Sequence, residues 1–269
     1  SRMKNIAVIG GGAAGFFSAI SVKTHYPNYE VFLFEKSSKI LSKVKISGGG
    51  RCNVTNSTSD IDVLTKAYPR GGKKLKNIFH QFGTLDTRNW FETRGVPLKV
   101  EPDGRVFPIS NNSQSIIDCL VNECEKSNIK IELLKSVKAL SKVKSKWIIN
   151  FNDTSSSISF DSVIIASGGS PKLKGFDWLK ILGHKIINPI PSLFTFNMPN
   201  EPIISLSGIA LNNVRIKILN TKIEILGPLL ITHWGMSGPV ILKASSIGAR
   251  DLFDKKYFCL LYTSPSPRD

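Results

Sequence analysis

The sequence predicts an α/β protein, with a parallel sheet in its first part and an antiparallel β domain after it. The first observation is the succession of a short apolar strand (Asn5–Ile9), a glycine turn, a helix (Ala13–His25) and a second strand (Tyr29–Phe34). A strand, a helix and a strand within about 30 residues form a βαβ unit, whose strands run parallel. The second observation is a change of residue pattern after Pro189, where prolines and short segments of alternating polar and apolar residues prevail.

Length and composition restrict the class of protein. The 269 residues suffice for one large or two ordinary domains. With 41% hydrophobic and 21% charged residues, the chain is neither disordered nor fibrous. We see no signal peptide and no apolar run near the ~20 residues of a membrane span, so we expect a soluble, cytoplasmic protein without a membrane partner. The four cysteines form no CxxC pair, which argues for reduced thiols and against a metal site.

The formal net charge of +16 has two interpretations. A strong basic excess can indicate a polyanionic partner such as RNA. The excess is mostly lysine, however, and the lysines are spread along the chain, as in a compositionally biased proteome. We favour the compositional interpretation and keep RNA as an alternative.

The remaining elements follow from periodicity. Leu75–Arg94 has helical spacing, and Ser110–Ser127 predicts an amphipathic helix. The inner face of this second helix carries Ile116, Ile117, Leu120, Val121 and Cys124. Predicted strands are the end of Pro102–Pro108, Lys130–Leu134, a meander of Val137–Lys142, Lys146–Phe151 and Ser157–Phe160, and a buried strand over Ser162–Ser170.

Three parts follow from this division. We expect a cofactor-binding domain over residues 1–188 and an inserted antiparallel β domain over 189–258, with strands at Val214–Leu219 and Lys222–Leu226. The last residues, 259–269, read "CLLYTSPSPRD" and show neither a hydrophobic periodicity nor the capping residues of a helix. We interpret them as a non-native tail.

The first glycine motif is Gly10-x-Gly12-x-x-Gly15, where the first strand becomes a helix. Gly10 permits the tight turn, Gly12 lets a pyrophosphate approach the backbone, and Gly15 lets the helix pack close to the strand. The N–H groups at the helix start then face the phosphates. Glu35 ends the second strand, 20 residues after Gly15, where its carboxylate can bind ribose hydroxyls. The motif predicts a Rossmann-like dinucleotide site, which by itself suits FAD or NAD.

A second and a third glycine run accompany the first. The second is "KISGGGRCNVTN", in which Arg51 can pair with phosphate, and Asn53, Thr55 and Asn56 can bind ribityl or ring atoms. The third, "IIASGGSP", ends a strand in glycines. The residues that we expect to contact the cofactor are Gly10, Gly12, Ala13, Ala14, Gly15, Glu35, Lys36, Ser47, Gly48, Gly49, Gly50, Arg51, Cys52, Asn53, Ala166, Ser167, Gly168 and Gly169.

At these segments the chain resembles the BaiN-like NAD(P)/FAD-dependent oxidoreductases, flavoproteins of the bile-acid-operon type with a glutathione-reductase-like FAD domain. The matching pieces are "VIGGGAAG", "KISGGGRCNVTN", "DGRVFPIS", "IIASGGSP", "GHKIINPIPSL" and "THWGMSGPVIL", in family order over nearly the whole chain. The resemblance implies FAD in the first site, a second contact at Gly48–Asn53, and NAD(P)H as electron donor. It also implies a final segment that closes over the flavin, so we expect this chain to be cut short and its second domain to be incomplete.

Few side chains suggest chemistry of their own, because FAD carries the redox step. Cys52 has no cysteine partner near it in the sequence, which disfavours a dithiol mechanism and favours a packing role. His233, in "THWGMSGP", can protonate a substrate while the flavin delivers hydride. A histidine that hydrogen-bonds the turn backbone is the alternative.

The first functional prediction is an FAD-dependent reductase of a small unsaturated or keto compound, using NAD(P)H. Reduction of a nucleobase in RNA, uridine to dihydrouridine, is an alternative within the same chemistry. A non-catalytic flavin-binding fragment is a second alternative, because the final segment is missing. An NAD-only dehydrogenase leaves "SGGGRCN" unexplained.

Overall fold

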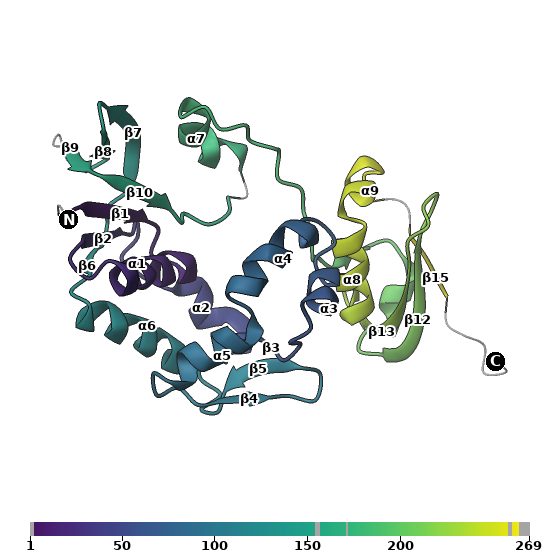
Figure 1. Cartoon of the computed structure of the whole chain (residues 1–269). Coiled ribbons are helices and arrows are strands. Elements are labelled where there is room, and N and C mark those ends of the chain that lie inside the picture. The colour runs from purple at the N-terminus through teal and green to yellow at the C-terminus, as the bar shows by residue number, and fades with distance from the viewer. Residues whose placement is uncertain (1–2, 154–156, 171, 258–259, 264–269) are drawn as a thin grey trace. The chain divides into compact units, whose positions relative to one another are not determined.

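The computed structural model of the chain describes residues 3–153, 157–170, 172–257 and 260–263 (Figure 1). The chain divides into two compact units, Ser1–Ile187 and Asn188–Asp269. The predicted boundary lies one residue later, between residues 188 and 189.

A four-stranded parallel sheet forms the centre of the first unit, in the order β10-β1-β2-β6. The chain leaves β1 (Asn5–Ile9) through α1 (Ala13–His25) and enters β2 (Glu30–Phe34) on one side of β1. The strand β10 (Ser162–Ile165) pairs with β1 on its other side. Because β1 has the next strand of the chain, β2, on one side and the much later β10 on the other, the strand order changes direction at β1, and open α/β sheets bind ligands at the carboxyl ends of strands at such a point.

The two faces of this sheet are covered by different elements (Figure 1). Alternate side chains of β1 point to opposite faces, so Ile6 and Val8 belong to one core and Ala7 and Ile9 to the other. The first core packs against α1 and α6 (Gln114–Lys126), and the second against the antiparallel meander of β7 (Val137–Val143), β8 (Lys146–Phe151) and β9 (Ser157–Phe160). Helices, parallel sheet and meander form three layers.

Smaller elements complete the first unit. A three-stranded antiparallel sheet has the order β3-β5-β4. The remaining elements of this unit are α2 (Ser42–Ile46), η1 (Ser47–Gly50), β3 (Thr55–Asn56), α3 (Ile61–Lys66), α4 (Gly72–Gln81), α5 (Thr84–Glu92), β4 (Leu98–Val100), β5 (Arg105–Pro108), β6 (Lys130–Glu132), η2 (Leu173–Phe176) and α7 (Asp177–Ile181).

The βαβ unit, the long amphipathic helix and the meander are confirmed. On α6, Ile116, Ile117, Leu120 and Cys124 are buried as predicted, whereas Val121 is partly buried. The prediction of a buried strand over Ser162–Ser170 is wrong in two respects, because β10 ends at Ile165 and lies at the sheet edge with Ile165 37% exposed. The sequence analysis also missed α3 and β4, which are short.

The second unit is a five-stranded sheet in the order β11-β14-β13-β12-β15, with two helices after its hairpins. Its core includes Ile216 and Ile231 from the sheet and Ile241 from the first of these helices. The elements are β11 (Phe196–Asn197), η3 (Pro202–Leu206), β12 (Ala210–Ile218), β13 (Glu224–Thr232), β14 (Gly235–Ser237), α8 (Pro239–Ile247), α9 (Ala249–Asp254) and β15 (Leu260–Thr263).

The second unit differs from the prediction in its helices. The sequence indicated only antiparallel strands, but Pro239 is the first residue of α8, a position where proline is favoured because its missing N–H has no helical partner. In the predicted tail, residues 260–263 pair with β12 as the edge strand β15. Cys259 and residues 264–269 lie outside the described residues, as does Pro171 of the third glycine run, and the non-native origin of the tail stays a prediction.

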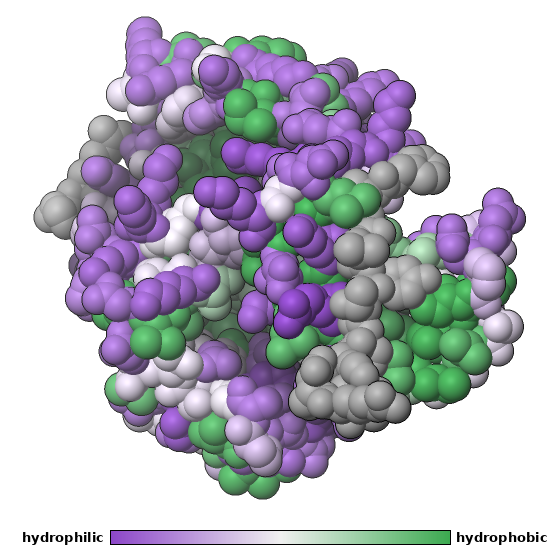
Figure 2. Space-filling view, turned by 90° about the vertical axis from the view of Figure 1, so that its right-hand side faces the viewer, coloured by the Kyte–Doolittle hydropathy of each residue, from purple (hydrophilic) through white to green (hydrophobic). Residues whose placement is uncertain are grey.

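The surface is rich in polar groups. Hydrophilic residues prevail on the face drawn in Figure 2, with hydrophobic groups between them. In the part of the chain that the structure describes, no helix combines the length and the apolar character that crossing a membrane requires. Nor does any group of three or more His, Cys, Asp or Glu side chains in that part of the chain lie together as metal ligands would.

Candidate cofactor-binding site

The first glycine turn is packed so tightly that two of its glycines have no room for a side chain. A Cβ on Gly10, whose φ is +116°, would lie 2.3 Å from the carbonyl oxygen of Ala166. A Cβ on Gly15 would lie 1.8 Å from the carbonyl oxygen of Gly10. Around Gly12, in contrast, a Cβ would have no heavy atom within 4 Å. The backbone is therefore closed at both ends of the motif and open at its middle residue.

The open glycine lies at the start of α1. Gly12 is the N-cap of this helix and offers no side-chain cap, and the first turn carries no acidic residue. The N–H groups of a helix start have no partners within the helix and favour anions, as does the helix dipole. Ala13 and Ala14 are exposed beside Gly12. This end of α1 fits a phosphate group.

Glu35 is held at the end of β2 by the same turn. Its Oε2 accepts a hydrogen bond from the N–H of Gly11 at 2.7 Å, and its Oε1 accepts one from Ser37 at 2.8 Å. Burial by itself would raise the pKa of this carboxyl, but the hydrogen bonds from Ser37 and Gly11 outweigh it and the pKa is lowered. Glu35 is thus a fixed, ionised acceptor beside the glycine turn, and its neighbour Lys36 is exposed.

The third glycine run lies against the first. The N–H of Ala166 donates to the carbonyl of Ile9 at 2.8 Å, and Ser167 follows within contact of Gly10. Gly168 and Gly169 are exposed, and a Cβ on either would meet no atom within 4 Å. Segments about 155 residues apart in the sequence therefore form one wall, which continues the parallel pairing of β1 with β10.

The second glycine run is a left-handed turn that only glycine adopts easily. Gly48, Gly49 and Gly50 have φ values of +56°, +68° and +85°. A Cβ on Gly48 would lie 2.7 Å from the N atom of Asn53, whereas Gly49 and Gly50 have no heavy atom within 4 Å of theirs. This loop also presents bare backbone to open space.

Two residues that the sequence analysis missed hold the glycine runs in place. Ser113 is buried. Its N–H donates to the carbonyl of Gly50 at 2.8 Å, and its hydroxyl donates to the carbonyl of Lys45 at 2.7 Å. Leu41 is buried and donates its N–H to the carbonyl of Gly11 at 2.8 Å. The available sequence signal for Ser113 was a serine in the first turn of the predicted amphipathic helix.

Arg51 has partners within the protein. Its Nη1 lies 2.6 Å from Oε1 of Glu101, and its guanidinium stacks 3.9 Å from the ring centroid of Phe107. Glu101 also pairs with Arg105 at 3.4 Å, and its side chain is only 20% exposed. Arg51 is therefore oriented by the β4–β5 hairpin, and its side chain remains 33% exposed.

Cys52 and Ser47 form a backbone hydrogen bond that spans the second glycine run. The N–H of Cys52 donates to the carbonyl of Ser47, and the cysteine side chain is buried. Burial raises the pKa of the Cys52 thiol, so it stays protonated. This environment fits the predicted packing role.

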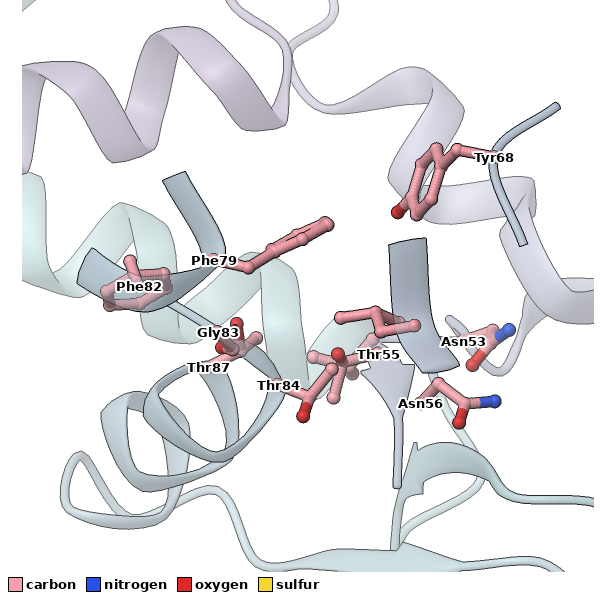
Figure 3. A pocket seen from close by; sticks show the side chains of 11 residues that line it. Asn53, Thr55, Asn56, Tyr68, Phe79, Phe82, Gly83, Thr84 and Thr87 are labelled. Carbon is pink, nitrogen blue, oxygen red and sulfur yellow. Dashed lines mark hydrogen bonds between the residues drawn. The ribbon is translucent and has the colours of Figure 1, made fainter. Parts of the chain in front are cut away.

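A pocket of about 300 Å³ begins where the second glycine run ends (Figure 3). Asn53, Thr55 and Asn56 line one part of it, and the rings of Tyr68 and Phe79 line another. With its amide nitrogen facing the chain, Asn53 donates to the carbonyls of Thr55 and Val106 at 2.9 and 3.2 Å. The pocket and the glycine runs all belong to the first unit.

His233 lies in the second unit, at the tip of the β13–β14 hairpin. Thr232 pairs with Gly235, so His233 and Trp234 are the two loop residues. Both are exposed, and their rings meet edge to face at 4.5 Å. The glycines of "THWGMSGP" are structural, because a Cβ on Gly235 would lie 2.2 Å from the carbonyl oxygen of Phe196.

A comparison with known protein families matches residues 4–226 to the HI0933-like protein Rossmann domain. The chain belongs to this family. The membership and the Rossmann-type fold that the glycine motifs predicted are thereby confirmed. Among solved structures, the open conformation of a flavocytochrome c3 fumarate reductase matches with a TM-score of 0.55 and 18% identity over 79% of this chain and 47% of that one, which supports the fold.

Two curated relatives are similar over most of the chain. The 3-dehydro-bile acid delta(4,6)-reductase of Clostridium scindens is 27% identical over 262 residues, which are 94% of this chain and 63% of the relative. The ribosomal RNA dihydrouridine synthase of Escherichia coli is 30% identical over 252 residues, 89% of this chain and 60% of the relative. The chain thus spans about three fifths of the length of these relatives.

Proposed function

We propose that this chain is the cofactor-binding part of an FAD-dependent oxidoreductase, which uses NAD(P)H to reduce an unsaturated or keto substrate. One observation carries the proposal: three glycine runs from distant parts of the first unit each present bare backbone to open space. A mononucleotide or a simple NAD site needs only the first run. A second backbone loop at Ser47–Asn53 suits the longer reach of a flavin dinucleotide.

The residues present fit FAD. A Cβ at Gly12, Gly49 or Gly169 would point into unoccupied volume, as expected of backbone that a ligand approaches. The start of α1 suits the pyrophosphate and the ionised carboxylate of Glu35 suits ribose hydroxyls. The exposed part of Arg51 suits a phosphate or a ring oxygen. When bound, FAD supplies the acceptance and donation of hydride.

The chain's own residues bind the cofactor and orient the groups that contact it. Ser113 and Leu41 fix the glycine runs through backbone hydrogen bonds, so that little ordering is left for the moment of binding. Glu101 aims Arg51. We propose His233 as the proton donor to the substrate, because it is an exposed ionisable group in a rigid two-residue loop.

Reduction of a nucleobase in RNA is the second candidate. The net charge of +16 is compatible with a polyanionic substrate, and one similar protein is named a ribosomal RNA dihydrouridine synthase. The other similar protein is named a bile-acid reductase. Both names describe the addition of hydrogen to a substrate, which is the chemistry that we propose for this chain.

The test is the visible spectrum of the protein purified from its complete gene, recorded before and after anaerobic addition of NADPH. A flavin spectrum that bleaches supports the oxidoreductase. A flavin spectrum that dithionite bleaches and NADPH does not would contradict NADPH as donor. Protein without flavin, even after incubation with FAD, would refute the FAD site.

A further inference from the structure

The pocket beside the second glycine run has two chemically distinct sides (Figure 3). The rings of Tyr68 and Phe79 lie with centroids 5.7 Å apart at an angle of 46° and provide aromatic surface. Asn53 provides its amide oxygen, because its amide nitrogen donates to the carbonyls of Thr55 and Val106. Asn56 provides its Nδ2 group, because its Oδ1 accepts from both the N–H and the hydroxyl of Thr58. A flat ring with hydrogen-bonding atoms on its edge satisfies both sides.

A purely hydrocarbon ligand satisfies this pocket poorly. An apolar surface against Asn53 and Asn56 would take the amide oxygen of Asn53 and the Nδ2 group of Asn56 out of water without giving them a partner, which is unfavourable. The volume of about 300 Å³ is at the lower end of the range for small-molecule sites. It suits one heteroaromatic ring system rather than a large fused hydrocarbon.

The segment that supplies the aromatic side is strongly basic. We call residues 63–85 the basic segment, because it contains five lysines and arginines and no aspartate or glutamate. These cations are Lys66, Arg70, Lys73, Lys74 and Lys76.

The cations of the basic segment adjoin the lining residues. Lys66 precedes Tyr68 by two residues, and Lys76 precedes Phe79 by one turn of α4. Lys76 pairs with Asp62 and so ties α4 to α3, whereas Lys73 and Lys74 are exposed in the first turn of α4. Lysines therefore lie close in sequence to both aromatic residues of the pocket.

We propose that this pocket is a nucleotide-binding site. A base stacks on Tyr68 and Phe79 and bonds Asn53 and Asn56 through its edge, while its phosphate binds Lys73 and Lys74. Stacking and lysine contacts together are how proteins hold nucleotides without a glycine motif. The nucleotide is supplied either by NADPH or by an RNA strand. Its use as electron donor or as substrate rests on the proposed function, but its binding does not.

The test measures equilibrium binding of two probes, NADPH by its own fluorescence and a labelled single-stranded 12-nucleotide RNA by anisotropy. Two variants, Tyr68→Leu and the pair Lys73→Gln/Lys74→Gln, are compared with the wild type. The matched control is Lys138→Gln/Lys144→Gln, which removes the same charge from exposed positions of the meander. Thermal melting of each variant verifies that the fold is kept.

The site predicts that both pocket variants weaken one probe on the order of tenfold and that the control does not. Loss of NADPH binding alone identifies the dinucleotide. Loss of RNA binding, with the salt slope reduced by about 1.4 for the two lysines, identifies the strand. If both pocket variants bind both probes as the control does, the site is refuted. A loss with the lysine pair and none with Tyr68→Leu would mean backbone attraction only and would also refute the pocket.

This test can fail independently of the proposed function. A protein that binds flavin and is bleached by NADPH, but whose pocket variants bind both probes normally, contradicts only the pocket. If either pocket variant loses its flavin, the pocket belongs to the flavin and the nucleotide site is refuted.

Discussion

Alanine at Gly12 and alanine at Gly15 should have opposite effects, although the two residues share one motif. At Gly15 the new methyl group would lie 1.8 Å from the carbonyl oxygen of Gly10 and 3.3 Å from Cδ1 of Leu33, so α1 must move away from the sheet. At Gly12 the methyl group meets no protein atom within 4 Å, and the φ of −91° suits alanine. The first change affects folding, and the second affects the space for a ligand.

The magnitudes follow from these contacts. Overpacking costs about 1–3 kcal/mol. At about 2–4 °C per kcal/mol for a unit of this size, Gly15→Ala should lower the melting temperature by roughly 2–12 °C. For Gly12→Ala, the entropy lost from the unfolded chain stabilises by about 0.4–1 kcal/mol, and alanine is a poorer N-cap by a similar amount. Its free energy of unfolding should therefore stay within about 1 kcal/mol of the wild type.

Binding separates the two variants further. Gly12→Ala should weaken FAD at least about tenfold, which is 1.4 kcal/mol, because the methyl group fills the approach to the start of α1. Denaturant unfolding and titration of FAD fluorescence measure the two quantities on the same preparations. Gly227→Ala in the second unit is the control, since its Cβ makes only an ordinary 3.5 Å contact with Val240. FAD binding by Gly12→Ala at wild-type affinity would refute the assignment of this turn to a pyrophosphate.

Three further predictions concern charged groups. Because the pKa of Glu35 is lowered on folding, its contribution to stability is present above about pH 4.5 and is lost as the pH falls below that value. Glu35→Gln should therefore make the free energy of unfolding less dependent on pH in the acid range. An unchanged pH dependence would contradict this prediction. Glu101→Gln should lower the free energy of unfolding by at most about 1 kcal/mol, yet it should weaken the binding of FAD several-fold because it releases Arg51. The control is Glu92→Gln, whose carboxylate lies 3.9 Å from Arg88. Equal FAD affinities in both variants would refute the positioning role. His233→Gln should leave the free energy of unfolding within about 0.5 kcal/mol of the wild type, because the residue is exposed. As the proton donor, His233 should contribute about 10²–10⁴-fold to kcat, which the variant loses. An unchanged kcat would remove His233 from the mechanism.

Local chemistry explains why parts of the fold and of the site were predictable. The strand, the Gly10–Gly15 turn, α1 and Glu35 follow one another within 35 residues, so their geometry is set by spacing alone. The alternation of the meander and the periodicity of α6 are likewise local patterns. The helices α8 and α9 were missed because they are short and follow a run of strands.

The sequence by itself determined that three runs of bare backbone accompany a Rossmann-type fold, because glycine is the residue whose absence of a side chain can be read directly. Only the tertiary structure decided which of these glycines face open space and which face the protein. Gly10 is closed by Ala166, and Arg51 is engaged by Glu101, through contacts between residues about 155 and 50 positions apart. Such contacts arise from the packing of whole elements, and no local pattern encodes the distance between them. For the same reason the pocket between Asn56 and Phe79 became visible only when β3, α3 and α4 were folded together.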